Sequence, residues 1–442
     1  MAPEDNKYLD KYSKQGNQNA DANRIIVVGV GGGGNNAVNH MFKQGVEHVS
    51  FVVVNTDHQA LVTSSVPNKL LIGPTVTRGL GAGNKPEIAR EAAEESAVDI
   101  ANLFDENIDM VFVTAGMGGG TGTGAAPVVA RIAKEKGLLT IGIVTIPFMF
   151  EGMKKIQKAI NGADEMGKYV DAIMIVNNER LIEIYSDFDF ETAFAKADDV
   201  LSTAASSIAE IITRKGYINL DFNDVNTTLR EGGTAIITVG YGEGENRVSK
   251  AIEDALNSPL LKNTDVLSSK RILFNLYYSR TANIKFNISE FRELNDFINS
   301  VEDDVDVIWG ITYDESLGDK VKFTILASGF DVTLNENKGE KYHPTSKVDT
   351  SVPQAIDTAK IGTYYGSETV GKFEREKETR NYIILNVEQF DDDSAIENFE
   401  KSPTFARNKR PLATPTTPKT ETATSPTATP TSNIISFDEN DG

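Results

Sequence analysis

Apolar residues in the first part of the chain form short continuous runs separated by segments with a helical period. The segment 24–30, RIIVVGV, is a β-branched run typical of strands buried on both faces. Similar patterns predict further strands at 50–57, 109–116, 138–147 and 172–178, and helices at 35–45, 85–104 and 125–137. Because strands and helices alternate, we expect an α/β domain over 24–190 with a parallel sheet covered by helices on both faces.

A longer helical segment follows this domain. Apolar side chains recur at helical spacing over 191–216 and predict one central helix about 35 Å long. A loop is expected at 217–225. A smaller α/β domain is predicted over 226–330, with strands at 233–244, 270–280, 305–314 and 320–328 and helices at 246–258 and 289–301.

The two ends of the chain lack this periodicity. Residues 1–23 are predicted to be a flexible N-terminal extension, and residues 331–410 a variable linker. Residues 411–442 begin with a run of Pro, Thr and Ala that cannot bury enough apolar surface to fold, so we expect a disordered tail there.

Composition and charge exclude several classes of protein. The 442 residues include no cysteine, which excludes disulfides and cysteine-ligated zinc and fits a cytoplasmic location. The formal net charge of −20 argues against a protein that binds nucleic acid by neutralising phosphates. There is no apolar run of about 18 residues, so no direct membrane insertion is expected, and any membrane contact would run through an adaptor.

Two glycine-rich turns are the strongest chemical signal in the chain. They read GVGGGGNN at 29–36 and GMGGGTGTG at 116–124, and each follows a predicted strand and opens a helix. Bare backbone at such a turn lets N–H groups approach an anion, and the helix N-terminus adds its positive dipole. Because the carboxyl ends of parallel strands meet at one crevice, we expect both turns to converge on one polyphosphate.

A dinucleotide site is the main alternative for the first turn. Gly29, Gly31 and Gly34 satisfy G-x-G-x-x-G, and Asp57 closes the next strand where a ribose-binding acid would stand. An oxidoreductase using NAD would leave the second turn without a role. The chain has no G-x-x-x-x-G-K-[ST] motif, which excludes a P-loop NTPase.

Six stretches in a fixed order extend the argument beyond the glycine turns. They are GVGGGGNNAVN (29–39), VNTD (54–57), RGLGAGNKPE (78–87), GGGTGTGAAPVVA (118–130), PFMFEG (147–152) and NLDFNDV (219–225). Together they resemble the tubulin family of GTPases, and within it the bacterial FtsZ branch, over roughly residues 24–330. The resemblance implies a Rossmann-like GTPase domain, a central helix, a smaller C-terminal α/β domain, and head-to-tail polymerisation in the bacterial division ring.

The resemblance also implies which residues bind GTP or GDP. The first turn would hold the α and β phosphates, the second the β and γ phosphates, and the loop after Arg78 would sense the γ phosphate, with a ribose contact from the loop near 150. The residues in that order are Gly31, Gly32, Gly33, Asn35 and Asn36; Gly118, Gly119, Gly120, Thr121 and Gly122; Gly81, Ala82 and Gly83; and Glu151. Mg²⁺ would bridge the phosphates and keep most of its waters, and no set of metal-binding side chains is expected.

Guanine would be recognised near the start of the central helix. By the resemblance, Asp198 accepts hydrogen bonds from guanine N1–H and N2–H, which adenine lacks, Phe194 stacks on the base, and Asn178 makes a further contact. The alternatives are that Asp198 only complements the helix dipole and that Phe194 only continues the apolar stripe.

The loop with Asn219, Asp221 and Asp224 is implied to act on another subunit. It follows the far end of the central helix, so its acids would reach the nucleotide of the next subunit and orient a water at the γ phosphate. The alternative for Asp224 is a helix N-cap, whereas Asp221 caps nothing obvious in the sequence.

Three features depart from the family pattern. Lys155 stands where the family usually has an arginine near the phosphates and is implied to contact the nucleotide in its place. Asn84 and Lys85 replace the usual residues after GAG. A lysine loses the bidentate fork of arginine, so slower turnover, or a scaffold that binds GTP without turnover, is an alternative. Two tail segments, 391–410 and 433–442, are candidates for docking a membrane-anchoring adaptor, and an unbound solvated tail is the alternative for each.

Overall fold

The computed structural model describes a single folded unit and little beyond it. It covers residues 24–46, 49–184, 190–258, 266, 269–302, 304–329, 357–366 and 370–371. The expectations for residues 1–23, for most of 331–410, including the segment 391–410, and for 411–442 fall outside the described residues. No helix among the described residues is long and apolar enough to cross a membrane.

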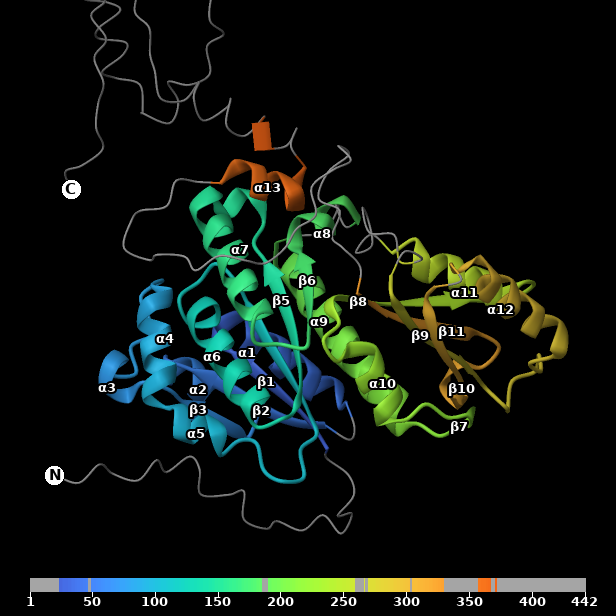
Figure 1. The fold of residues 1–442 in the computed structure, drawn as a ribbon, viewed down its shortest axis with the longest axis horizontal. Coiled ribbons are helices and arrows are strands. Elements are labelled where there is room, and N and C mark those ends of the chain that lie inside the picture. The colour runs from blue at the N-terminus through green and yellow to red at the C-terminus, as the bar shows by residue number, and fades with distance from the viewer. Residues whose placement is uncertain are drawn as a thin grey trace, which may run out of the picture. The chain divides into compact units, whose positions relative to one another are not determined.

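Six parallel strands form the first half of the sheet (Figure 1). Their order is β3-β2-β1-β4-β5-β6, and β1 pairs with both β2 and β4. The strands are β1 (Ile25–Val30), β2 (Val49–Asn55), β3 (Asn68–Leu71), β4 (Met110–Gly116), β5 (Leu139–Ile146) and β6 (Ala172–Asn177). The chain order reverses between β1 and β4, which is where ligands bind in sheets of this kind. The predicted Rossmann-like parallel sheet is confirmed.

The helices of this half connect the parallel strands. They are α1 (Gly31–Gln44), α2 (His58–Thr63), α3 (Pro74–Thr77), α4 (Pro86–Glu95), α5 (Ala97–Ala101), α6 (Thr121–Glu135), α7 (Met153–Gly167) and α8 (Asn178–Ile184), with a 3₁₀ turn at Met149–Glu151. Helices α1 and α6 begin inside the glycine turns, four residues earlier than predicted. The predicted helix 85–104 divides into α4 and α5 at Ser96.

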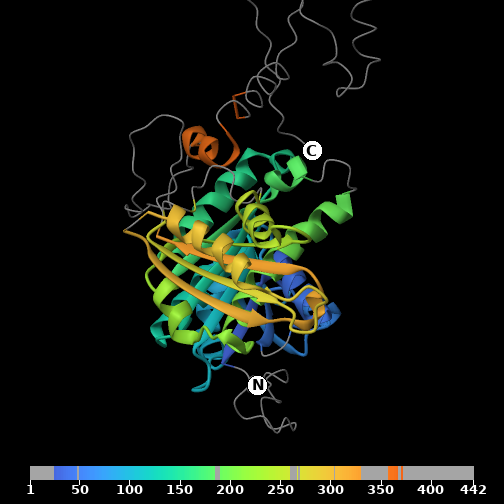
Figure 2. The ribbon, with the colours of Figure 1, turned by 90° about the vertical axis from the view of Figure 1, so that its right-hand side faces the viewer.

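The central helix α9 (Phe190–Thr213) leads into a second set of strands that continues the sheet. Their order from β6 is β8-β11-β9-β10-β7, and Figure 2 views the molecule from their side. The elements are β7 (Gly216–Ile218), α10 (Phe222–Leu229), β8 (Gly233–Gly242), α11 (Arg247–Leu256), β9 (Arg271–Tyr278), α12 (Ile288–Ser300), β10 (Asp306–Tyr313), a 3₁₀ turn at Glu315–Leu317, β11 (Val321–Ser328) and α13 (Thr358–Tyr365). Helix α13 lies within the segment predicted to be linker.

Two clusters of buried apolar side chains among the described residues meet at β11. Alternate residues of β11 serve both: Leu326 packs with Leu201 and Ile208 of α9, whereas Phe323 and Ile325 pack on the other side of the sheet. The first core therefore continues from the parallel strands into the second half. Helix α9 packs on both halves of the molecule and fixes their relation.

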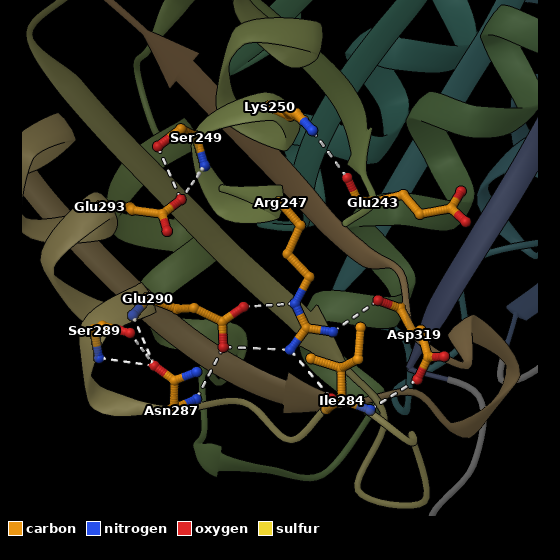
Figure 3. A network of polar contacts seen from close by, with 10 residues as sticks. All are labelled: Glu243, Arg247, Ser249, Lys250, Ile284, Asn287, Ser289, Glu290, Glu293 and Asp319. Atoms are coloured by element: carbon orange, nitrogen blue, oxygen red, sulfur yellow. Dashed lines mark hydrogen bonds and ion pairs between the residues drawn. The ribbon is translucent and has the colours of Figure 1, made fainter. Parts of the chain in front are cut away.

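A buried arginine organises the second core (Figure 3). The Arg247 side chain is 2% exposed; its Nε donates to Glu290 Oε1 at 2.5 Å and its Nη1 to the Asp319 carbonyl at 2.7 Å. Glu290 also accepts from the Asn287 backbone N–H at 2.9 Å and so closes the capping box of α12. The charge of Arg247 is thus paired with a carboxylate and hydrogen-bonded through all three of its nitrogens in the interior.

Candidate nucleotide-binding site

The two glycine turns contact each other at the crevice between β1 and β4. A Cβ on Gly31 would lie 2.6 Å from the Gly122 nitrogen, and one on Gly33 would lie 3.0 Å from the Gly116 Cα. Gly31 also has φ +72°, a conformation that favours glycine. The close approach of the two backbones therefore requires bare residues on both turns, a reason for the glycines that was not predicted from the sequence.

Both turns leave backbone N–H groups at the helix N-termini free for a ligand. Val30 and Gly120, the N-cap residues of α1 and α6, supply no side-chain cap. A Cβ on Gly32 or on Gly119 would meet nothing within 4 Å. Uncapped N–H groups beside open space, at the positive ends of two helices, form a site that fits phosphate groups.

The asparagines of the first turn have different positions. Asn36 is exposed, whereas Asn35 is 3% exposed and hydrogen-bonds within the turn. With its amide oriented to satisfy its hydrogen bonds, Asn35 donates to the carbonyls of Gly29 at 2.8 Å and Gly31 at 3.0 Å. Asn35 therefore holds the shape of the turn through its own hydrogen bonds, whereas Asn36 is open to solvent.

A third loop, residues 81–85, lies against the second glycine turn. A Cβ on Gly120 would be 3.1 Å from both the Ala82 Cβ and the Lys85 nitrogen. The Thr56 and Thr121 hydroxyls are 2.7 Å apart, and the Gly81 N–H donates to the Thr56 carbonyl at 3.1 Å. The third loop is thereby fixed beside the open backbone of the second turn, and Gly83 has no neighbour within 4 Å of a Cβ.

The loop 147–152 and helix α7 form the wall next to Gly118. A Cβ on Gly118 would lie 2.9 Å from Pro147 Cγ and from Lys155 Cγ. Lys155 Nζ is 2.5 Å from Glu151 Oε2, and the side chains are 41% and 15% exposed. The lysine that replaces the family arginine is therefore paired with the carboxylate implied to contact ribose.

Two polar groups that are implied to read a base, Asn178 and Asp198, lie at the start of α8 and on α9. Asn178 is 6% exposed and its Oδ1 has no hydrogen-bond partner within the described part of the chain. Burial raises the pKa of the Asp198 carboxyl to about 6, with His40 opposing and Asp199 adding to the shift. A buried acceptor without a donor is costly unless a ligand supplies one. Phe194 lies on α9, and its side chain is outside the described part of the structure.

The Asp57 carboxylate, a candidate ribose ligand in a dinucleotide site, is engaged in capping a helix. Its Oδ1 accepts from the backbone N–H groups of Gln59 at 2.8 Å and Ala60 at 3.3 Å, which makes it the N-cap of α2. This capping role explains Asp57 without a dinucleotide.

The acidic loop lies near the amino ends of β1 and β6, whereas the glycine turns lie at the carboxyl ends of β1 and β4. The Arg24 guanidinium, at the amino end of β1, is 5.9 Å from the centre of the Phe222 ring, and Arg230 binds Asp171 at 3.2 Å just before β6. Six residues of β1 separate these amino ends from the glycine turns, about 20 Å at ~3.3 Å per residue. Asp221 and Asp224 therefore cannot reach the crevice of their own chain.

The helix in this loop begins earlier than predicted, and the capping roles differ. Asp221 is the N-cap of α10 and accepts from the N–H groups of Asn223 at 2.8 Å and Asp224 at 3.3 Å. Asp224 instead occupies the third helical position and accepts from the Asp221 N–H at 2.8 Å. The alternative that Asp224 is the N-cap is wrong, and so is the expectation that Asp221 caps nothing, because the two residues form a reciprocal capping box. Asn219 Oδ1 accepts from the Gly216 N–H at 2.7 Å.

Sequence reasoning did not predict Thr56 and Lys158 in the site. Thr56 joins the third loop to the second turn, and Lys158 Nζ donates to the Asn84 carbonyl at 3.1 Å. Helix α7, which carries Lys158, was not predicted either. Its signal is present, because Ile156, Ile160 and Ala163 recur on one buried face.

Comparisons with known proteins agree with this arrangement. The family model for the Tubulin/FtsZ GTPase domain matches residues 24–186, and that for the FtsZ C-terminal domain matches residues 233–331. Cell division protein FtsZ of Porphyromonas gingivalis is 48% identical over 392 residues, which cover 87% of this chain and 85% of the relative.

Solved structures show the same fold. An empty FtsZ dimer from M. jannaschii matches with a TM-score of 0.65 and 36% identity, over 80% of this chain and 100% of that chain. The GDP-bound CetZ1 monomer from Haloferax volcanii matches with a TM-score of 0.61 over 78% of this chain and 99% of that chain; at 19% identity it shows the fold alone. With both domains matched in order and a relative 48% identical over most of its length, this chain belongs to the FtsZ family of tubulin-like GTPases.

Proposed function

We propose that this chain is a GTPase of bacterial cell division that assembles head to tail into filaments. Family membership and the cell-division relative support the general role, and the FtsZ dimer from M. jannaschii supports self-association. The observation that carries the mechanism is the separation of two sets of groups. Open N–H groups gather at the carboxyl ends of the parallel strands, and the acids Asp221 and Asp224 lie near their amino ends.

Nucleotide binding follows from the groups at the crevice. The uncapped starts of α1 and α6 donate to the phosphates, and the open backbone at Gly32, Gly83 and Gly119 lets them approach. Asn178 Oδ1 and the Asp198 carboxylate accept from guanine donors. Adenine offers no N1–H or N2–H, so it would leave these buried acceptors unpaired.

Mg²⁺ is expected to enter with the nucleotide. No group of three or more His, Cys, Asp or Glu side chains is placed to hold a metal within the described residues, so phosphate oxygens and water would supply most ligands. The ion neutralises charge on the phosphates when bound.

Hydrolysis is proposed to need two chains. Asp221 is exposed and Asp224 half-buried at the end opposite the crevice, so each can meet the γ phosphate of a neighbour stacked below. A carboxylate there orients and deprotonates the attacking water. Such an interface joins two different surfaces and does not close, so it propagates as a filament.

The chain is proposed to act in the cytoplasm at the division site and to be attached to the membrane by an adaptor that binds its tail. The segments 391–410 and 433–442 would dock on an adaptor, and both lie outside the described residues. A GTP-binding scaffold without turnover is the second candidate, because Lys155 is paired with Glu151 and its charge is partly neutralised.

The test is GTPase activity per mole of protein, measured with Mg²⁺ over a wide range of protein concentration. We expect almost no activity below a threshold and a steep rise above it, because the site is complete only between subunits. A specific activity that is constant with concentration would contradict the shared site. Sedimentation with GTP but without hydrolysis would favour the scaffold.

A further inference from the structure

Helix α13 packs on the GTP-binding half, against α7. The Asp357 N–H donates to Gln157 Oε1 at 2.8 Å, and Lys360 forms an ion pair with Asp164, so the start of α13 is anchored along α7. Ile361 is fully buried in this contact region. We term residues 357–365 the brace.

The end of the brace reaches the loop that carries Glu151. Asn177 Nδ2, at the end of β6, donates to the Tyr364 carbonyl at 2.7 Å. The hydroxyl of the next residue, Tyr365, donates to the Pro147 carbonyl, and Tyr365 is 7% exposed. The pKa of this phenol is raised well above its usual range by burial and by the carboxylates of Glu179 and Glu151, so it remains a donor at any working pH.

Pro147 lies between the brace and the second glycine turn. Its Cγ would be 2.9 Å from a Cβ on Gly118, so its position limits the space at that turn. The rest of the loop is held by carboxylates: Glu151 accepts from the Phe148 N–H at 2.9 Å and Glu179 from the Met149 N–H at 2.8 Å. The Tyr365 hydroxyl fixes the loop at its first residue.

Helix α7 connects the brace to the third loop, residues 81–85, through side chains on two of its sides. On one side it bears Gln157 and Asp164, which hold the brace, and on another it bears Lys155 and Lys158. Lys158 binds the Asn84 carbonyl and Lys155 pairs with Glu151. A shift of α7 would therefore move two walls of the crevice together.

We propose that the brace holds α7 and the loop 147–152 against the glycine turns, and that Tyr365 is a positioning residue for nucleotide binding. The inference rests on the proposed function. Tyr365 does not touch the nucleotide; without its hydroxyl the Pro147 carbonyl is buried without a donor, and the loop relaxes away from Gly118.

The test compares Tyr365→Phe with Tyr364→Phe in the full-length chain. Both phenols are buried enough to raise their pKa far above the usual range, but only the Tyr365 hydroxyl bonds to Pro147. Dissociation constants for GDP and a non-hydrolysable GTP analogue are measured below the concentration at which filaments form. We expect Tyr365→Phe to weaken both ligands about five- to thirtyfold, and Tyr364→Phe to change them less than about twofold.

Lys360→Gln provides a second variant at the far end of the brace, with a smaller weakening of both ligands expected. Thermal unfolding without nucleotide identifies a purely structural role: a lower Tm with unchanged dissociation constants for Tyr365→Phe would overturn the inference, as would tighter binding. If the wild-type chain binds neither nucleotide, the proposed function fails and the inference with it. If the wild type binds and Tyr365→Phe binds equally well, only the role of the brace fails.

Discussion

At the scale of single residues, Asp198 shows how burial and recognition oppose each other. Burial raises its pKa to about 6, so the carboxyl of the empty site becomes protonated at a higher pH than an exposed aspartate does. Guanine requires the ionised form, because only the carboxylate accepts both N1–H and N2–H. The proposed role of Asp198 therefore predicts that the nucleotide binds the deprotonated state more tightly and that the preference for guanine is lost as pH falls through about 6.

This predicts a pH-dependent ratio of GTP to ATP affinity. Between pH 7.5 and pH 5 the ratio for the wild type should fall about tenfold, because a group of pKa about 6 is almost fully ionised at pH 7.5 and about one-tenth ionised at pH 5. Equilibrium competition between the two nucleotides measures it, and protonation of the phosphates cancels because both ligands carry them. Asp198→Asn should have a lower ratio at pH 7.5 with little pH dependence. If Asp198→Asn shows the same pH dependence of the GTP-to-ATP affinity ratio as the wild type, another group is responsible for the titration.

At the scale of elements, α10 combines stability and proposed catalysis in one carboxylate. Asp221 caps the helix, and asparagine caps as well as aspartate but carries no charge. Asp221→Asn should therefore leave the Tm nearly unchanged and lower GTP turnover about a hundredfold. Asp221→Ala should lower turnover equally and also cost about 1 kcal/mol of stability through loss of the cap. If GTP turnover falls only in Asp221→Ala, together with its Tm, and stays normal in Asp221→Asn, then capping is the only role of Asp221.

Elements with a local signal could be predicted, whereas those that depend on distant contacts could not. The convergence of the glycine turns follows from strand order and parallel direction. The start of α10 was missed because NLDFND reads as polar loop until the reciprocal bonds of Asp221 and Asp224 are seen. Helix α13 has eight residues, too few to be stable alone, and its partners on α7 lie about two hundred residues earlier in the chain.

At the scale of the whole molecule, a charged cluster joins the end of α9 to the second half of the sheet. Lys322 Nζ is 2.6 Å from Glu210 Oε2, and Arg214 Nη1 is 3.0 Å from Asp314 Oδ2. Lys322 also lies 4.1 Å from the centre of the Tyr277 ring. Burial alone would raise the pKa of Asp314, yet hydrogen bonds from Ser316 and the charges of Arg214 and Lys322 hold that pKa below its usual range.

The cluster predicts how strongly the two halves depend on one buried cation. The Lys322 side chain is 9% exposed, and Lys322→Met keeps its shape over Tyr277 but leaves Glu210 and Asp314 without that cation. Because Glu210 is 28% exposed, the variant should lose less stability than one with a fully buried pair broken. We expect its free energy of unfolding, measured in urea at pH 7, to fall by about 2–3 kcal/mol.

The matched control is two residues earlier on the same segment. Lys320 pairs with Glu243 at 3.2 Å, but the side chains are 56% and 67% exposed, so Lys320→Met should cost less than about 0.5 kcal/mol. Acid provides the second contrast. Because the pKa of Asp314 is lowered in the folded state, its stabilising effect is present above the unfolded value of about 3.9 and is lost as pH falls below it. The difference between wild type and Lys322→Met should therefore shrink below pH 4. Equal losses for the two methionine variants at pH 7, or a difference that persists in acid, would mean that packing and not charge couples the central helix to the second half of the sheet.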